Sequence, residues 1–277
     1  MVTGFVFLSM MDRISDQGDR YFVGTSGYHY EDWRNVFYPH DLPSNKMLDF
    51  YSQQFKTVEL NATYYKIPNY KTFVNLADKT PADFHFIVKT NQETTHRRQE
   101  NKKSLEKLAD SVRPLVDTGK FHGYLAQFPY SFKNSEQNRK YLVQTKKIIG
   151  SYALFVEFRN YTWLKPQIQD FLKQNDIGYV NVDQPKIKGL LPAQDIATSG
   201  IGYIRWHGRN EKDWWEGQGM ARYDYEYSED ELKEWLTNIS NILRKTFKTY
   251  IFFNNHPTGN AVKNAKQMIE ILKSKAL

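Results

Sequence analysis

The sequence has no cysteine among its 277 residues. This absence excludes disulfides, a thiolate nucleophile, and zinc or iron–sulfur sites that use cysteine ligands. Long apolar runs are also missing. The apolar segment 5–11 is far too short to span a bilayer, and neither a preceding Lys or Arg nor a small-residue cleavage site marks it as a signal peptide. We therefore expect no membrane contact, a cytoplasmic location, and an extension outside the fold over residues 1–19.

Motifs of common enzyme classes are absent as well. No glycine fingerprint of the dinucleotide-binding or P-loop kind follows a β-rich run, and no G-x-S-x-G elbow indicates a serine hydrolase. No cofactor is therefore evident. An excess of Lys and Arg gives a formal charge of +7, which favours anionic partners such as phosphorylated metabolites or nucleic acid. Lysines on solvated helix faces would give the same excess without any partner.

Short β-rich runs alternate with amphipathic stretches along the chain, a pattern typical of βαβ units in a parallel sheet. Helices are predicted over residues 104–116, 137–149, 229–243 and 261–272. Strands are predicted over residues 21–26, 57–64, 83–90, 121–128, 152–159, 178–183, 201–207 and 249–255. Eight strands with helical crossovers predict an α/β fold, a single (β/α)8 TIM barrel domain over residues 20–277.

Several predicted strands alternate between polar and apolar residues more cleanly than a strand buried on both faces usually does. In residues 152–159, Glu157 and Arg159 share one face, opposite Leu154, Val156 and Phe158. If the apolar face packs under the helices, the polar face points into the barrel. Polar groups should then gather near the carboxyl ends of the strands, where barrel enzymes carry their active sites.

Seven motifs at or near these strand ends resemble, in order and spacing, the signature of the YecE-like proteins, the domain of unknown function 72. They are GTSG (24–27), FYP (37–39), TVELN (57–61), LAQFP (125–129), VEFR (156–159), YIRWHGR (203–209) and FNN (253–255). The resemblance extends from about residue 21 to the C-terminus, and it departs from the usual family pattern at Tyr28 and at Thr94-Thr95-His96. It implies a TIM-barrel fold, in agreement with the strand count, and supplies no activity or substrate.

Residues on the predicted inner face form a charged set at the carboxyl end of the barrel. The set comprises Glu59, Asn61, Lys89, Gln127, Glu157, Arg159, Asp183, Arg205, His207 and one of Asn254 and Asn255. It can form a pocket for a ligand, or a self-satisfied ion-pair network, because its charges balance and buried charges need partners. A barrel gains little stability from such a network over packed apolar side chains, which favours the pocket.

Within this set, His207 is the candidate general acid or base, because an imidazole titrates near neutral pH, and Glu157 or Asp183 would move protons with it. The alternative is an imidazole that one of these carboxylates holds for structure. Lys89 suggests a Schiff-base lysine, against a simple salt bridge to Glu59. Glu59, Glu157 and Asp183 are also candidate carboxylates for glycoside hydrolysis.

An anion site is expected around the loops that follow the last two strands, where barrels often bind phosphate. Residues assigned to ligand binding are Arg159, Arg205, Arg209, Asn61, Gln127, Asn254, Asn255 and Tyr28. A metal cluster is not expected, because cations are interleaved with the few carboxylates, although a single Mg²⁺ is not excluded.

Two loops on the same face are rich in aromatic residues, 28–38 and 214–227, and His96-Arg97-Arg98 adds a small basic patch. Rings beside cations suit stacking on bases or sugars, although they also pack loops onto a barrel rim. Three hypotheses follow. In the first, the chain is an enzyme with acid/base or hydrolytic chemistry, or a binding protein, for a small anionic ligand that is phosphorylated or sugar-like. In the second, it is a nucleic-acid-binding or processing barrel. In the third, it is a non-catalytic scaffold with a structural ion-pair network.

Overall fold

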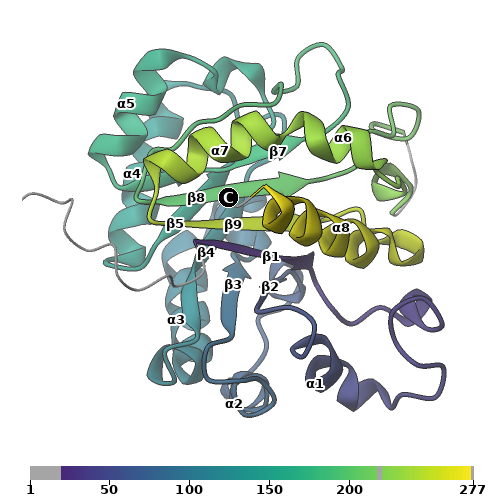
Figure 1. Cartoon of the computed structure of the whole chain (residues 1–277). Coiled ribbons are helices and arrows are strands. Elements are labelled where there is room, and N and C mark those ends of the chain that lie inside the picture. Colours follow the sequence, from purple (N-terminus) through teal and green to yellow (C-terminus); the bar gives the residue numbers. More distant parts are fainter. Residues whose placement is uncertain (1–19, 217–219, 276–277) are drawn as a thin grey trace, which may run out of the picture.

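Nine parallel strands form one sheet in the computed structural model, which describes residues 20–216 and 220–275 (Figure 1). The strands are β1 (Tyr21–Ser26), β2 (Thr57–Leu60), β3 (His85–Lys89), β4 (Phe121–Gln127), β5 (Leu154–Glu157), β6 (Ile177–Tyr179), β7 (Asn181–Asp183), β8 (Ile201–Trp206) and β9 (Lys248–Phe253). Their order is β6-β5-β4-β3-β2-β1-β9-β8-β7. The predicted extension, residues 1–19, lies outside the described residues.

The two ends of this sheet meet in one short segment of chain. β6 pairs with β5 and β7 pairs with β8, yet only Val180 separates β6 from β7. The backbone N–H of Val180 donates to the carbonyl of Val156 at 3.1 Å, so the ladder with β5 continues to the bend. β6 and β7 together are therefore the single strand predicted over residues 178–183, and they close the sheet into a nearly complete barrel. The predicted α/β barrel is confirmed.

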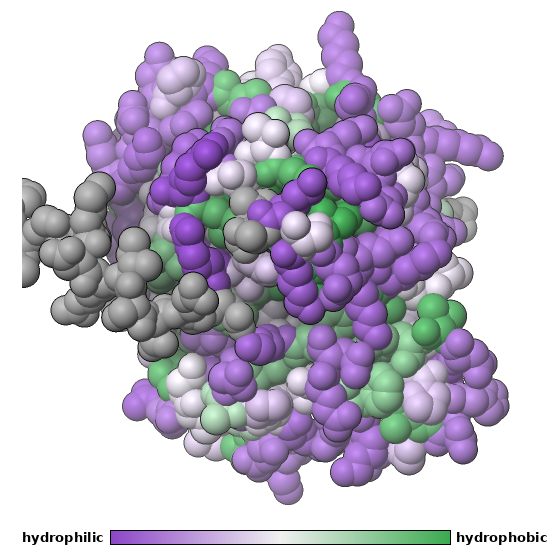
Figure 2. Space-filling view, viewed as in Figure 1, coloured by the Kyte–Doolittle hydropathy of each residue, from purple (hydrophilic) through white to green (hydrophobic). Residues whose placement is uncertain are grey.

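Helices surround the barrel and connect its strands (Figure 1). They are α1 (Met47–Tyr51), α2 (Tyr70–Asp78), α3 (Asn101–Asp117), α4 (Glu136–Ile149), α5 (Pro166–Gln174), α6 (Glu229–Glu234), α7 (Leu236–Lys245) and α8 (Asn260–Ser274). Their outer faces are polar, and Figure 2 shows hydrophilic residues over most of the face in view. None of the helices in residues 20–216 and 220–275 has the length and apolar character that a bilayer crossing requires.

Side-chain caps set several helix starts. The Ser135 hydroxyl accepts from the backbone N–H of Asn138 and so caps α4, while Ser228 and Glu231 form a capping box at the start of α6. The helix predicted over residues 229–243 is two helices instead of one. The chain bends at Trp235 between α6 and α7, and the indole N–H there donates to Asp183 at 2.7 Å.

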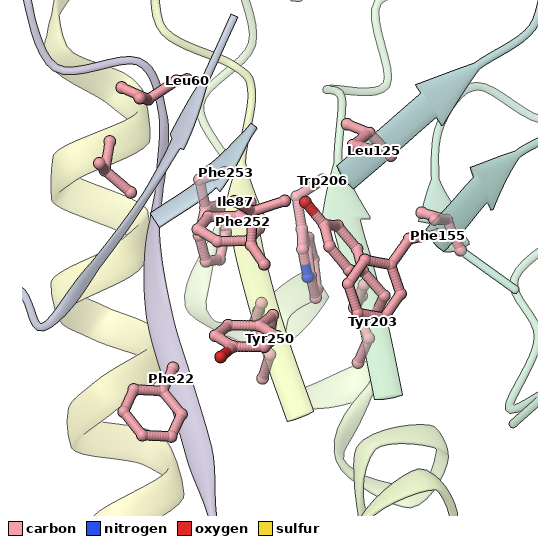
Figure 3. Packing of buried hydrophobic residues seen from close by; sticks show 14 of the residues in the cluster. Phe22, Leu60, Ile87, Leu125, Phe155, Tyr203, Trp206, Tyr250, Phe252 and Phe253 are labelled. Atoms are coloured by element: carbon pink, nitrogen blue, oxygen red, sulfur yellow. The ribbon is translucent and has the colours of Figure 1, made fainter. Parts of the chain in front are cut away.

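Aromatic side chains from several strands pack together in the barrel interior, and Figure 3 labels Phe155, Tyr203 and Tyr250 among them. Tyr203 of β8 contacts Phe155 of β5 with ring centroids 4.7 Å apart, although these strands do not pair. Tyr250 of β9 reaches the same Phe155 ring at 6.5 Å, across the barrel. These rings lie on the same strand faces as the inward polar residues. The aromatic layer therefore lies below a layer of polar side chains.

Most of the barrel strands end earlier than predicted, and this shapes the carboxyl face. β2 stops at Leu60 instead of residue 64, and a 3₁₀ turn (Ala62–Tyr64) follows. The turn is held by the Thr63 hydroxyl, which donates to the carbonyl of Lys89 at 2.5 Å. Residues 61–64 therefore lie at the rim of the barrel mouth beside the end of β3.

Candidate functional site

Three non-neighbouring strands bring one arginine between two glutamates inside the barrel. The guanidinium of Arg205 on β8 donates from Nε and Nη2 to the two carboxylate oxygens of Glu59 on β2, at 2.9 and 2.7 Å. Its Nη1 donates to Oε2 of Glu157 on β5 at 2.5 Å. All three side chains are buried. Arg205 thus makes a bidentate and a single charge-assisted pair, the strong kind of hydrogen bond.

Both glutamates are ionised in this arrangement. Burial disfavours their charged forms, but the neighbouring Arg205 charge outweighs it and lowers the pKa of Glu59, and lowers that of Glu157 well below its ordinary value. Ser26 Oγ and Tyr203 OH also donate to Glu59, each at 2.7 Å. Neither carboxyl therefore holds a proton for acid catalysis at neutral pH.

His207 completes the network from the end of β8. Its Nε2 lies 3.1 Å from Glu157 Oε1, and its Nδ1 lies 3.1 Å from the Nδ2 of Asn254. Burial lowers the pKa of His207 to about 3, so the imidazole is neutral. A neutral ring with its proton on Nε2 satisfies both contacts, because it donates to Glu157 and accepts from Asn254. Both nitrogens are thus occupied in a buried position.

Arg159 supplies the second cation of the network. Its Nε lies 3.0 Å from Glu157 Oε1, and its guanidinium stacks on the Trp214 ring at 5.2 Å. The two carboxylates, Glu59 and Glu157, are balanced by Arg159 and Arg205. This part of the predicted set matches the ion-pair interpretation, since its charges cancel and its fixed cations have counter-ions.

A cavity of about 1000 Å³ opens at the carboxyl ends of the strands. Four residues of the predicted inward set line it, Asn61, Lys89, Gln127 and Asn254, together with Tyr28, which was predicted to bind a ligand. Glu59, Glu157, Arg205 and His207 are not among its lining residues, and each is at most 1% exposed. The predicted polar residues therefore divide into a buried ionic network and an accessible cavity wall.

Lys89 is a cation of the predicted inward set that does not belong to the buried ionic network. Its Nζ donates to the amide oxygen Oε1 of Gln127 at 2.8 Å and lies 4.9 Å from the centroid of the Tyr64 ring. The predicted salt bridge to Glu59 is wrong, because Arg205, Ser26 and Tyr203 use both oxygens of that carboxylate. Among residues 20–216 and 220–275, no ion pair involves Lys89. Burial, followed by the charge of Arg205, lowers the pKa of Lys89 to about 8.

The described wall of this cavity carries cations and histidines but no Asp or Glu. Its cations are Lys79, Lys89 and Arg222, and its histidines are His29, His96 and His256. Asn61 adds an amide whose Oδ1 is buried without a hydrogen-bond partner in the described part of the chain. The described wall thus carries positive charge and no carboxylate.

Asp183 and Arg209 lie outside this site, so Asp183 does not belong to the inward set and Arg209 does not line the cavity. Asp183 is in register with Trp206, whose ring packs against Trp235 at the junction of α6 and α7. Its carboxylate accepts from Tyr227 OH at 2.6 Å and pairs with Arg209 Nη2 at 2.8 Å. β7 follows the bend at residue 180 and presents Asp183 to the helices. The two residues line a separate cavity of about 500 Å³.

The predicted anion site after the last two strands is not assembled. Gly208 has φ +90, and this left-handed turn ends the alternation that would have placed Arg209 above Arg205. Asn255 faces α8, where its Nδ2 donates to Asn264 Oδ1 at 2.8 Å and to the carbonyl of Tyr225 at 2.9 Å. Arg205 itself is enclosed by glutamates. Of that group, only Asn254 lines the cavity.

Comparison with known proteins places the chain in a family. A family model described as "Protein of unknown function DUF72" matches residues 22–277. The chain belongs to this family. It is 32% identical over 268 residues to the UPF0759 protein YunF of Bacillus subtilis (strain 168), covering 91% of this chain and 94% of that protein. The family resemblance of the strand-end motifs is confirmed.

Solved structures of DUF72 family proteins have the same architecture. The crystal structure of a DUF72 protein from Thermotoga maritima MSB8 is 40% identical and gives a TM-score of 0.85, covering 91% of this chain and 99% of that chain. The crystal structure of a DUF72 protein from Enterococcus faecalis V583 gives a TM-score of 0.82 at 23% identity, covering 91% and 95% of the two chains. The latter likeness shows the fold alone.

The sequence analysis missed several residues of this DUF72 site. Ser26 and Tyr203 share the inward parity of Glu59 and Arg205, so strand alternation could have found them. His96 and Tyr223 come from loops, and no periodicity places a loop side chain at a cavity. In the described ranges, no three His, Asp or Glu side chains converge as a metal site would require.

Proposed function

We propose that this DUF72 protein binds a small anionic metabolite, phosphorylated or sugar-like, in the cavity at the carboxyl face of its barrel. One observation carries the proposal: the described lining has three fixed cations and no carboxylate. Two unit charges 4 Å apart interact by about 4 kcal/mol at an effective dielectric constant of 20, against about 1 kcal/mol in bulk water. An anion that reaches Lys89 gains from this difference.

The size and walls of the cavity agree with a small organic ligand. Pockets for such ligands measure roughly 300–1,000 Å³ and combine apolar walls with a few polar groups that set orientation. Here Tyr28, Tyr30 and Tyr223 contribute aromatic surface, and Asn61 and Gln127 contribute amides.

The buried ionic network has a supporting role in this proposal. Gln127, which holds the Lys89 ammonium, is in register with Glu157 on the neighbouring strand. The network fixes β2, β5 and β8 relative to one another, and it neutralises its own charge. Lys89 has no counter-ion in the described part of the chain. It is therefore the cation of the barrel interior that can pair with a ligand anion.

Isothermal titration calorimetry tests the proposal with inorganic phosphate, ribose 5-phosphate and ribose as probes. We expect ribose 5-phosphate to bind more tightly than ribose, and Lys89→Met to weaken its binding at least about tenfold, which corresponds to 1.4 kcal/mol. Lys107→Met is the matched control, because Lys107 is exposed on α3 and outside the cavity. Binding in Lys89→Met equal to wild type, or no binding of either phosphate compound, would contradict the proposal.

A single-stranded decathymidine is the fourth probe. Its binding in preference to ribose 5-phosphate, with a steep loss of affinity as salt rises, would overturn the small-ligand proposal in favour of a nucleic-acid-binding barrel. Weak binding of the oligonucleotide beside tight binding of ribose 5-phosphate supports the proposal.

A further inference from the structure

Lys89 differs from the other cations of the barrel interior in its surroundings. Arg159 and Arg205 each contact a carboxylate, whereas the Lys89 ammonium contacts a neutral amide, that of Gln127. Its position at the end of β3 places it in the wall of the cavity, next to the ring of Tyr64. The primary amine of Lys89 thus lies in the wall of an accessible cavity, and the Tyr64 ring covers one side of the amine.

We propose that Lys89 is an imine-forming lysine, whose amine condenses with the carbonyl carbon of an anionic aldehyde or ketone bound in the cavity. This inference rests on the proposed function and adds the chemical class of the ligand. Lysines of this kind are activated by burial or by a neighbouring cation, because both favour the neutral, nucleophilic amine.

Both forms of activation are present at Lys89. Burial and then the Arg205 charge lower its pKa, Glu59 and Glu157 oppose that shift, and Arg159 adds to it, with a resulting value of about 8. At pH 7, a lysine with that pKa is neutral in about one tenth of molecules, against roughly 0.04% for an ordinary lysine of pKa 10.4. The remaining molecules keep the ammonium that attracts an anionic ligand.

The reaction balances without an oxidant, a reductant or a second substrate. The nitrogen lone pair attacks the carbonyl carbon, a C–N bond forms, and the carbonyl electron pair moves to the oxygen, which takes up a proton. The C–O bond of this carbinolamine then breaks, and the oxygen leaves as water. In net terms, an ammonium and a carbonyl compound give a protonated imine and one water molecule.

His96 lies on the same wall of the cavity. Its ring contacts the Tyr64 ring at 5.2 Å, and Lys89 contacts that ring as well. Burial, followed by the charge of Lys89, lowers the pKa of His96 to about 4, so its imidazole is neutral and able to accept a proton. Its Nδ1 lies 2.8 Å from the Thr95 hydroxyl, which orients the ring. His96 and Lys89 therefore approach the same ring, and the neutral imidazole adds no charge that would repel the Lys89 ammonium.

Reductive trapping tests the inference with pyridoxal 5′-phosphate, an anionic aldehyde. The full chain is incubated with an equimolar amount, reduced with borohydride and mapped by peptide mass spectrometry. We expect Lys89 to carry at least ten times more label than Lys107, and inorganic phosphate to suppress the label at Lys89. Label spread over exposed lysines in proportion to their exposure, or none on Lys89, would overturn the inference.

Lys89→Arg removes the primary amine, and arginine cannot form an imine. We expect this variant to lose the dominant site of labelling, whereas Lys107→Arg, at an exposed position outside the cavity, keeps the label at Lys89. The wild-type protein separates this inference from the proposed function. If wild type binds ribose 5-phosphate but Lys89 is not labelled, the imine chemistry fails and the proposed function stands. If wild type binds neither phosphate compound, the proposed function fails. The wild-type peptide map decides the labelling question even where the variant folds poorly.

Discussion

Replacing Arg205 with methionine tests the account of the buried network most directly. The side chain makes four hydrogen bonds, two to Glu59, one to Glu157 and one to Ser26 at 3.3 Å. Its removal leaves two buried carboxylates without their shared cation. Removing one partner of a buried ion pair costs about 3–5 kcal/mol in the free energy of unfolding, and the loss here should lie at the upper end. For a chain of this size class, the melting temperature should fall by about 6–20 °C.

The pH dependence of stability provides a second, independent test of this prediction. In wild type the pKa of Glu157 is depressed, so its stabilising contribution is present above the unfolded-state pKa of about 4.3 and is lost as pH falls through the lower folded pKa. Without Arg205, only the hydrogen bonds from Ser26 and Tyr203 oppose the burial of Glu59, so its folded pKa should rise above 4.3. Glu157 keeps Arg159 as its counter-ion. The variant should then lose stability as pH rises from 5 to 8, and its deficit relative to wild type should be smaller at pH 5.

Urea unfolding followed by circular dichroism measures both effects. Arg244→Met on the exposed face of α7 is the control, and it should change the free energy of unfolding by no more than about 0.5 kcal/mol. The double variant Glu59→Gln, Arg205→Met removes the carboxylate that has lost its cation and leaves Glu157 paired with Arg159, so it should be more stable than Arg205→Met alone. A cost below about 1 kcal/mol for Arg205→Met, or a deficit independent of pH, would refute the reasoning.

Three further predictions concern the cavity and the core. The rate of imine formation by pyridoxal 5′-phosphate at Lys89 should rise with pH with a midpoint near 8, measured by absorbance; a midpoint near 10 would show an unperturbed amine. Asp183→Asn should reduce the free energy of unfolding by about 1–3 kcal/mol, because the carboxylate pairs with Arg209. The variant should bind ribose 5-phosphate within twofold of wild type, because Asp183 lines the separate, smaller cavity. Phe155→Ala should lower the free energy of unfolding, measured with urea, by about 3–5 kcal/mol. Phe247→Ala is the control, because Phe247 is 69% exposed. If the two variants are equally stable, Phe155 is not part of a packed aromatic layer.

Strand alternation explains how far the site could be predicted. Side chains on a strand point alternately to its two faces, so the inner positions of Glu59, Glu157 and Arg205 follow from local sequence alone. The same rule failed for Asp183, because the strand bends at Val180 and its parity after the bend is set by pairing with β8. Alternation also ends at a turn, which is why Arg209, beyond Gly208, was misplaced.

By itself, the sequence determined the family, the barrel and the inward face of most strands, because motif order and hydrophobic period are local properties of the chain. Only the tertiary structure decided which inward charges neutralise one another and which one faces an open space. Glu59 pairs with Arg205, so it is unavailable to Lys89. That choice depends on distances between atoms of non-neighbouring strands, and a buried carboxylate pairs with the cation that the closed barrel brings within reach.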